Sequence, residues 1–190
     1  MAEQTLKNHF LVAMPSLIDP NFAGTVVYLV AHDAKHGATG VVVNRETTLA
    51  LTEIFEKAGI PVAEGVSVPD LACIGGPVEE GRGFVLHEPA GRYGLSEEIA
   101  PGICFTQTRD VLEDVAQGKG PAKRLVCLGY AGWTAGQLEG ELARNDWLTV
   151  PGDASVLFDV PAGMRYAAAL QVLGLDPETF LYSASEAGHA

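Results

Sequence analysis

The chain has 190 residues, of which 47% are hydrophobic and 19% are charged, and its formal net charge is −12. This length and composition indicate one globular domain, spanning residues 1–190, and exclude a largely disordered chain. The 12 lysines and arginines are scattered, with Lys123 and Arg124 the only adjacent pair. Because nucleic acids and anionic membranes bind clustered cations, we expect neither direct nucleic-acid binding nor membrane binding.

The sequence contains no apolar run of membrane-spanning length, and its first ten residues lack the basic and apolar segments of a secretory signal. We therefore expect a cytoplasmic protein. Three cysteines, Cys73, Cys104 and Cys127, lie far apart within apolar segments, and no C-x-x-C pair occurs. This pattern favours buried, reduced thiols over a zinc site or a dithiol redox site.

Hydrophobic patterning predicts several short strands and helices in alternation. Strands are expected where apolar or β-branched residues run without a helical period, at 10–14, 25–31, 41–43, 71–74, 84–87, 103–106 and 155–158. Helices are expected where apolar residues recur every three or four positions, at 51–58, 108–118 and 162–173. Polar or glycine-bearing stretches predict loops and turns, at 32–40, 61–69, 79–83 and 92–102. No structure is assigned to the tail over 176–190.

The stretch from 124 to 150 organises the rest of the chain. Leu125–Leu128 is continuously apolar, as in a strand that is covered on both faces, and we expect a tight turn over Gly129–Trp133 after it. Thr134 and Gln137 then have the spacing of a capping box at a helix start. A return strand follows the helix.

Two glycines, Gly136 and Gly140, would lie inside this expected helix, at a cost of about 1 kcal/mol each relative to alanine. Close backbone approach on the glycine face would offset that cost. Across the chain, strands and helices interleave but hairpin-like pairs also occur. This combination predicts the α+β class, as a single domain with a mixed β-sheet and helices packed on both faces. The alternative is a purely parallel, doubly wound sheet.

No sequence motif for a nucleotide, a nucleophile or a metal is complete. Gly118-Lys119-Gly120 lacks the spacing and the hydroxyl residue of a phosphate-binding loop, and no serine lies in a G-x-S-x-G context. His32 and His36 lie four residues apart, but in an expected loop and without a third ligand at a suitable spacing. We therefore expect no cofactor and no metal.

A candidate cleft lies where several expected strands end, since ligands commonly bind at such ends in α/β architectures. The segment Ala135–Gln137 would also present the free N–H groups of a helix N-terminus to an anion or a carboxylate. The alternative is that the aromatic residues pack the core and the glycines only permit tight turns. The candidate cleft residues are Asn44, Arg45, Gly75, Gly76, Arg82, His87, Gly129, Tyr130, Gly132 and Trp133.

Two classes of function remain open for this cleft. The first is a non-catalytic regulatory or binding module for an unknown small ligand or protein segment. The second is an enzyme of unknown reaction that uses Asn44, Arg82, His87 or Arg109. Because the sequence shows no nucleophile–base pair and no metal-ligand set, the first class is favoured. The sequence does not indicate the oligomeric state.

A series of segments in one order carries a resemblance to a known family. They are FLVAMPSLIDPNF at 10–22, VVYLVAHD at 26–33, GVVVNR at 40–45, GGPV at 75–78, RGFVLH at 82–87, TRDVL at 108–112, LGYAGWTAGQLE at 128–139, NDWLTVP at 145–151 and AGHA at 187–190. On these segments the chain resembles the AlgH/YqgE-like family of bacterial proteins over nearly its whole length. Tyr166 stands where that family usually has Trp, and Thr39 where Met is commoner.

The resemblance implies a mixed α+β fold without an established catalytic activity. The family name implies a role in regulating alginate production, and its members are often described as transcriptional regulators. The sequence contains no helix-turn-helix pattern and no basic recognition helix. If the regulatory role applies, we expect it to be indirect rather than through DNA binding.

Overall fold

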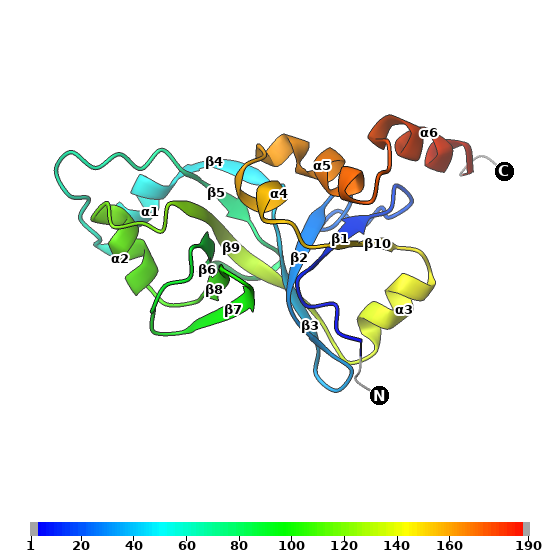
Figure 1. The fold of residues 1–190 in the computed structure, drawn as a ribbon, viewed down its shortest axis with the longest axis horizontal. Coiled ribbons are helices and arrows are strands. Elements are labelled where there is room, and N and C mark those ends of the chain that lie inside the picture. The colour runs from blue at the N-terminus through cyan, green and yellow to red at the C-terminus, as the bar shows by residue number, and fades with distance from the viewer. Residues whose placement is uncertain (1–3, 188–190) are drawn as a thin grey trace.

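The computed structural model describes residues 4–187, those from 184 onward by their backbone alone, and shows one strongly curled sheet with helices around it (Figure 1). The strands are β1 His9–Ala13, β2 Val26–Asp33, β3 Gly37–Val42, β4 Glu46–Ala50, β5 Leu71–Ile74, β6 Val78–Glu88, β7 Ser96–Ala100, β8 Ile103–Thr106, β9 Lys123–Trp133 and β10 Trp147–Pro151. The helices are α1 Leu51–Ala58, α2 Asp110–Ala116, α3 Gln137–Ala143, α4 Ala154–Phe158, α5 Arg165–Val172 and α6 Pro177–Ala187, with a 3₁₀ turn at Ala162–Met164. None of the described helices is long and apolar enough to cross a bilayer.

The sheet is mixed, as the sequence predicts. Its main path runs β10-β1-β2-β3-β9-β6-β8-β7, and every neighbouring pair along it is antiparallel. β4 pairs with β5, which in turn lies parallel to β9. The α+β class is therefore confirmed, and the purely parallel alternative is wrong.

Side chains alternate between the two faces of the sheet, and helices cover both. From β1, Phe10 and Val12 enter a central cluster that also contains Leu157 of α4 and Leu170 of α5. Leu11 of the same strand enters a second cluster, the α3 cluster, which contains residues of β2, β3, β9 and α3. A third cluster joins α1 and α2 to β6 and β9. Alternate side chains of β1 thus pack into clusters on opposite faces of the sheet, and helices contribute to both clusters, as expected.

Gly129 switches the alternation within β9, the strand shared by both halves of the sheet. Before it, Cys127 faces the central cluster, whereas after it Tyr130 contacts that cluster and Trp133 enters the α3 cluster. Gly129 has φ of 75°, and the pairing with β6 shifts register at this point. Such a bulge inserts a residue and reverses which side chains face inward. The expected turn over Gly129–Trp133 is therefore wrong, because the strand continues through the bulge.

Glycines also permit a close backbone crossing at this bulge. A Cβ added at Gly75 would lie 2.3 Å from the carbonyl oxygen of Gly129, and one at Gly76 would lie 2.2 Å from that of Tyr130. By contrast, Gly136 is the N-cap of α3 rather than a residue inside it, and Gly140 has no foreign backbone within 4 Å. The close approach expected at the helix glycines therefore occurs between β5 and β9 instead.

Four other expected segments differ in the structure. Most of the expected loop over 32–40 belongs to the β2–β3 hairpin, the expected turn over 79–83 lies inside β6, and β7 lies within the expected loop over 92–102. The segment expected as a strand at 155–158 is helical, because the Asp153 carboxylate accepts hydrogen bonds from the amides of Ser155 (2.8 Å) and Val156 (3.4 Å).

Candidate functional site

A hollow of about 260 Å³ opens where β3, β6, β8 and β9 meet, and two of the expected cleft residues line it. Arg82 reaches it from β6 and Tyr130 from β9. The remaining lining residues are Thr39, Glu79, Phe84, Phe105 and Gln107. The other eight expected cleft residues do not line this hollow.

The floor of the hollow consists of aromatic rings held by the core. Phe84 and Phe105 stack with centroids 5.6 Å apart and planes 5° apart, and both are buried. Tyr130 meets Phe84 edge to face, with centroids 5.6 Å apart and planes 79° apart. Offset stacked and edge-to-face pairs are the favoured aromatic arrangements, so the floor is packed and has a fixed shape.

Arg82 provides a half-exposed cation at this floor. Its guanidinium carbon lies 5.2 Å from the centroid of the Phe84 ring, within cation–π range. Its polar contacts are long, with 3.5 Å to the Glu79 carboxylate and 3.4 Å to the Gln107 side-chain oxygen. Because charge-assisted hydrogen bonds usually measure about 2.7–2.9 Å, the donors of Arg82 are only weakly engaged.

A bulge in β6 places Glu79 and Arg82 beside the hollow. The pairing between β6 and β9 shifts between Val78 and Gly83, and the residues between them lie outside the regular ladder. Glu79 has φ of 50°, a conformation that non-glycine residues rarely adopt. Bulges and such backbone outliers occur preferentially next to binding and catalytic sites, where they redirect side chains.

Asn44 and Arg45 lie away from this hollow and hold the segment that precedes β2. The Asn44 side chain accepts a hydrogen bond from the amide of Val26 (2.9 Å) and donates one to the carbonyl of Gly24 (3.0 Å). The Arg45 guanidinium donates to three carbonyls, those of Asn21 (2.8 Å), Ala23 (3.0 Å) and Pro20 (3.2 Å). Both side chains therefore have backbone partners that assign them a structural role in this arrangement.

Trp133 and Gly132 also have partners elsewhere. The Trp133 ring packs against Phe22 and Trp147, at centroid distances of 6.0 and 6.1 Å, within the α3 cluster. Gly132 pairs with Thr39 on β3. Gly75, Gly76 and Gly129 form the backbone crossing described above. At these five positions the contacts are those of packing residues, the alternative to a binding role.

His87 is fully buried on the opposite face of β6 from Phe84. Its Nδ1 lies 3.0 Å from the carbonyl oxygen of Pro89, and its Nε2 lies 2.7 Å from the hydroxyl oxygen of Thr106. Because a carbonyl only accepts, Nδ1 carries the proton and Nε2 accepts from the Thr106 hydroxyl. Burial lowers the pKa of His87, opposed by the hydrogen bond to Pro89, so the ring is neutral at pH 7.

Arg109, which the enzyme hypothesis would use, binds the end of α1. Its guanidinium donates to the carbonyl of Ala58 (2.7 Å) and approaches that of Gly59 (3.5 Å). The four polar residues of that hypothesis therefore lie apart. Asn44 binds the backbone before β2, and Arg82 lines the hollow. His87 binds Thr106 and Pro89, and Arg109 binds the end of α1. The structure does not group them around one reacting position.

The cysteines are buried, as predicted. Burial raises the pKa of the Cys73 thiol and raises that of Cys127 well above its usual range. Thiolates are the reactive form, so these two side chains are poor nucleophiles in the folded protein. Cys104 is buried as well.

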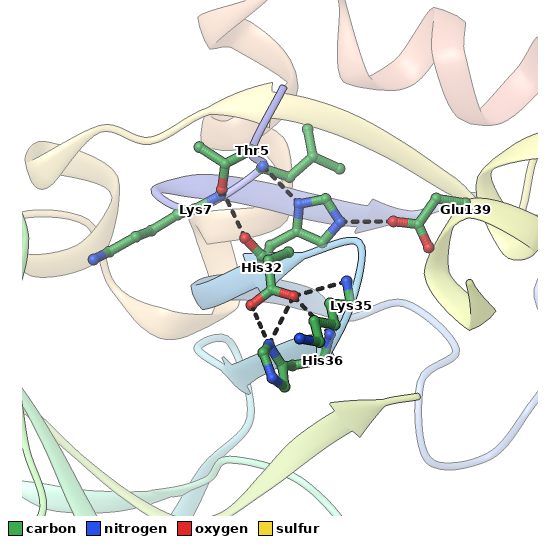
Figure 2. A network of polar contacts seen from close by, with 8 residues as sticks. Thr5, Lys7, His32, Lys35, His36 and Glu139 are labelled. Carbon is green, nitrogen blue, oxygen red and sulfur yellow. Dashed lines mark hydrogen bonds and ion pairs between the residues drawn. The ribbon is translucent and has the colours of Figure 1, made fainter. Parts of the chain in front are cut away.

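His32 and His36 point to different partners (Figure 2). The His32 ring lies between the amide of Leu6 and the carboxylate of Glu139, whereas the His36 ring contacts Asp33 of its own hairpin at 3.0 Å. Among the side chains that the structure describes, those of residues 4–183, no group of three or more His, Cys, Asp or Glu has the arrangement of a metal site.

Five residues of the hollow are absent from the sequence-based cleft: Thr39, Glu79, Phe84, Phe105 and Gln107. A signal for one of them, Phe84, is present in the period of two over Arg82, Phe84 and Leu86, which places these side chains on one face of a strand. The predicted turn over 79–83 leaves Arg82 outside the predicted strand over 84–87. The side chain of Gln107 comes from another strand's end, and only the pairing of β6 with β8 brings it near.

Comparison with known proteins gives the family. The model of a family described as AlgH-like matches residues 10–178. The chain belongs to the AlgH-like family. Among its relatives, a UPF0301 protein of Bordetella avium is 49% identical over 183 residues, covering 96% of this chain and 90% of the relative. A UPF0301 protein of Chromobacterium violaceum is 44% identical over 190 residues, covering all of both chains.

Solved structures agree with this membership. The solution structure of the AlgH protein from Pseudomonas aeruginosa matches with a TM-score of 0.77 and 43% identity over 94% of each chain. A crystal structure of the protein DIP2367 from Corynebacterium diphtheriae matches with a TM-score of 0.72, covering 96% of this chain and 93% of that one. Its identity is 19%, so this second match shows the fold alone. The resemblance noted from the sequence is confirmed.

Proposed function

We propose that this AlgH-like protein is a non-catalytic binding module whose hollow beside Arg82 receives part of a ligand or protein segment. The observation that carries the proposal is the Arg82 guanidinium over the Phe84 ring, with its two polar contacts at 3.4 Å or longer. A cation of this kind is held in place by its aromatic neighbour but has donors available for a stronger acceptor.

The size of the hollow favours a single inserted group. Sites for whole cofactors or drug-sized ligands usually enclose about 300–1,000 Å³, whereas this hollow measures about 260 Å³. One side chain of a protein segment, or a small molecule of similar size, fits this volume. The aromatic floor suits an apolar part of that group.

The chemistry of the rim favours a carboxylate next to the apolar part. A ligand carboxylate would replace the Glu79 carboxylate, whose contact with Arg82 measures 3.5 Å, and would accept two parallel hydrogen bonds from the guanidinium. Thr39 and Gln107 add hydroxyl and amide groups at the same rim. The enzyme alternative has less support, because Asn44, His87 and Arg109 already bind backbone or core partners elsewhere.

A peptide titration tests the proposal. The ¹⁵N-labelled protein is titrated with acetyl-Leu-Glu-Leu-amide and with acetyl-Leu-Gln-Leu-amide, which has the same shape without the charge. We expect amide shifts clustered at Arg82, Phe84 and Tyr130, stronger for the Glu peptide, and loss of this preference in Arg82→Gln. Scattered shifts, or an undiminished preference in the variant, would refute the binding role of the hollow.

A further inference from the structure

The imidazole of His32 connects the N-terminal segment to α3 (Figure 2). Its Nδ1 lies 2.9 Å from the backbone nitrogen of Leu6, and its Nε2 lies 2.7 Å from Oε1 of Glu139. Only 7% of the His32 side chain is exposed. A second contact also links the N-terminal segment to β2, since the Thr5 hydroxyl donates to the carbonyl of His32 at 3.0 Å.

These contacts define the proton positions on the ring. A backbone N–H can only donate, so Nδ1 of His32 must offer its lone pair to Leu6. Nε2 then carries the proton and donates it to the Glu139 carboxylate. This hydrogen bond from His32 is the largest cause that lowers the pKa of Glu139, in keeping with an ionised carboxylate. The ring in this arrangement is neutral.

We propose that His32 is a pH-sensitive clasp for the N-terminal segment, in which protonation of Nδ1 breaks the hydrogen bond from Leu6. After protonation, two N–H groups would face each other at the present 2.9 Å, so the contact must open. The hydrogen bond from Nε2 to Glu139 survives and becomes an ion pair. An unperturbed histidine changes charge between about pH 5 and 8, and this range sets the pH values at which the clasp is tested.

The charged groups around the ring permit this response. Glu139 of α3 is the carboxylate in contact with the ring, 2.7 Å from Nε2. On the β2–β3 hairpin, Asp33 pairs with His36 and also accepts from the amide of Lys35. On the N-terminal segment, Lys7 is directed to Glu97 of β7, 2.7 Å away. Protonation therefore exchanges the backbone hydrogen bond from Leu6 for a charge pair between His32 and Glu139.

The contacts on either side limit what is released. The amide of Asn8 donates to the carbonyl of Leu29 at 2.9 Å, and Lys7 keeps its ion pair with Glu97. Neither contact depends on the charge of His32, so the chain from Lys7 onward stays in place. Leu6 packs against the α3 cluster, and its release would uncover part of that cluster. The opening is therefore centred on the Leu6 amide, since the Thr5 hydroxyl still has the His32 carbonyl as acceptor (3.0 Å) and the His9 amide still has that of Leu6 (3.1 Å).

Amide exchange in the full-length protein tests the clasp. Protection factors, which correct for the intrinsic effect of pH on exchange, are compared for Leu6 and Asn8 between pH 8 and pH 5. We expect the protection of Leu6 to fall roughly five-fold on acidification, the change that corresponds to about 1 kcal/mol for one hydrogen bond, with Asn8 unchanged. The ¹⁵N shifts of the His32 ring should titrate with the same midpoint.

Two variants provide matched controls. In His32→Asn, the side-chain oxygen can accept from Leu6 without a titrating group, so the protection of Leu6 should be equal at both pH values. In His36→Asn, which alters the exposed histidine of the same hairpin, the wild-type response should remain. Constant protection of Leu6 in the wild type, a Leu6 midpoint that differs from that of the His32 ring, or a persistent pH response in His32→Asn would overturn the proposal.

Discussion

Gly76 and Gly129 approach each other so closely that a Cβ on Gly129 would lie 2.4 Å from the carbonyl oxygen of Gly76. This crossing brings the end of β5 onto β9 at the bulge where β9 passes from one half of the sheet to the other. Because Tyr130 follows directly, the same bulge sets the direction in which Tyr130 faces the Arg82 hollow. The glycines thus act on the candidate site through the backbone rather than by contacting a ligand.

Substituting Gly129 by alanine should destabilise the protein severely. The residue has φ of 75°, and the added methyl group would overlap the backbone of Gly76, which follows β5, and of Val78 in β6. We expect a loss of about 3 kcal/mol or more in the free energy of unfolding, from backbone strain and overpacking together. Urea denaturation measures it, with Gly81→Ala as control, because a Cβ there meets nothing within 4 Å. Equal stability of the two variants would contradict the crossing.

Removing the Arg45 side chain should lower stability, because its guanidinium binds three carbonyls of the segment before β2. For Arg45→Ala we expect a loss of about 1–2 kcal/mol, or roughly 2–8 °C in melting temperature for a chain of this length. Arg144→Ala is the control, since that side chain is 66% exposed and has one contact with Asp146 at 3.3 Å. A melting temperature unchanged in Arg45→Ala would argue against its structural role.

His87 should make the protein less stable as the pH falls. Burial lowers its pKa in the folded state below the unperturbed value of 6.5, so the unfolded chain takes up the proton first. The stabilisation is complete above about pH 6.5 and is lost as the pH falls toward the folded pKa. Chemical denaturation between pH 7 and 5 should give a flatter profile for His87→Gln than for the wild type. Equal slopes of the free energy of unfolding against pH in the two proteins would show that His87 does not contribute to the pH dependence.

Much of the fold follows from local pattern. The helix over Leu51–Ala58 combines one apolar face with Gly59 as its left-handed C-cap, and both signals are present in the sequence. The strand signals of β1 and β2 are equally local. In contrast, Ser96–Ala100 forms an edge strand whose sequence, S-E-E-I-A, is largely polar and exposed. Its pairing with β8 decides the structure there, and no local pattern indicates it.

The candidate site depends still more on long-range pairing. Arg82 and Tyr130 were identified as cleft residues, but the ring beneath Arg82 belongs to Phe84, which lies two residues along the same strand. The stretch over 79–83 contains two glycines and three charged residues, which is also the composition of a turn. Only the continued pairing with β9 makes it a bulged strand. Asn44 and Arg45 have the residue types of a binding site, and their partners became evident only from the folded backbone.

Photo-crosslinking in cells tests the central claim, that the hollow beside Arg82 receives a ligand or protein segment. Benzoylphenylalanine replaces Glu80, an exposed residue of the β6 bulge, or Glu178, an exposed residue of α6, as the matched control. We predict defined adducts from position 80 that disappear when Arg82→Gln is added, and none of the same adducts from position 178. Identical adducts at both positions, or adducts at position 80 that persist without Arg82, would contradict the account.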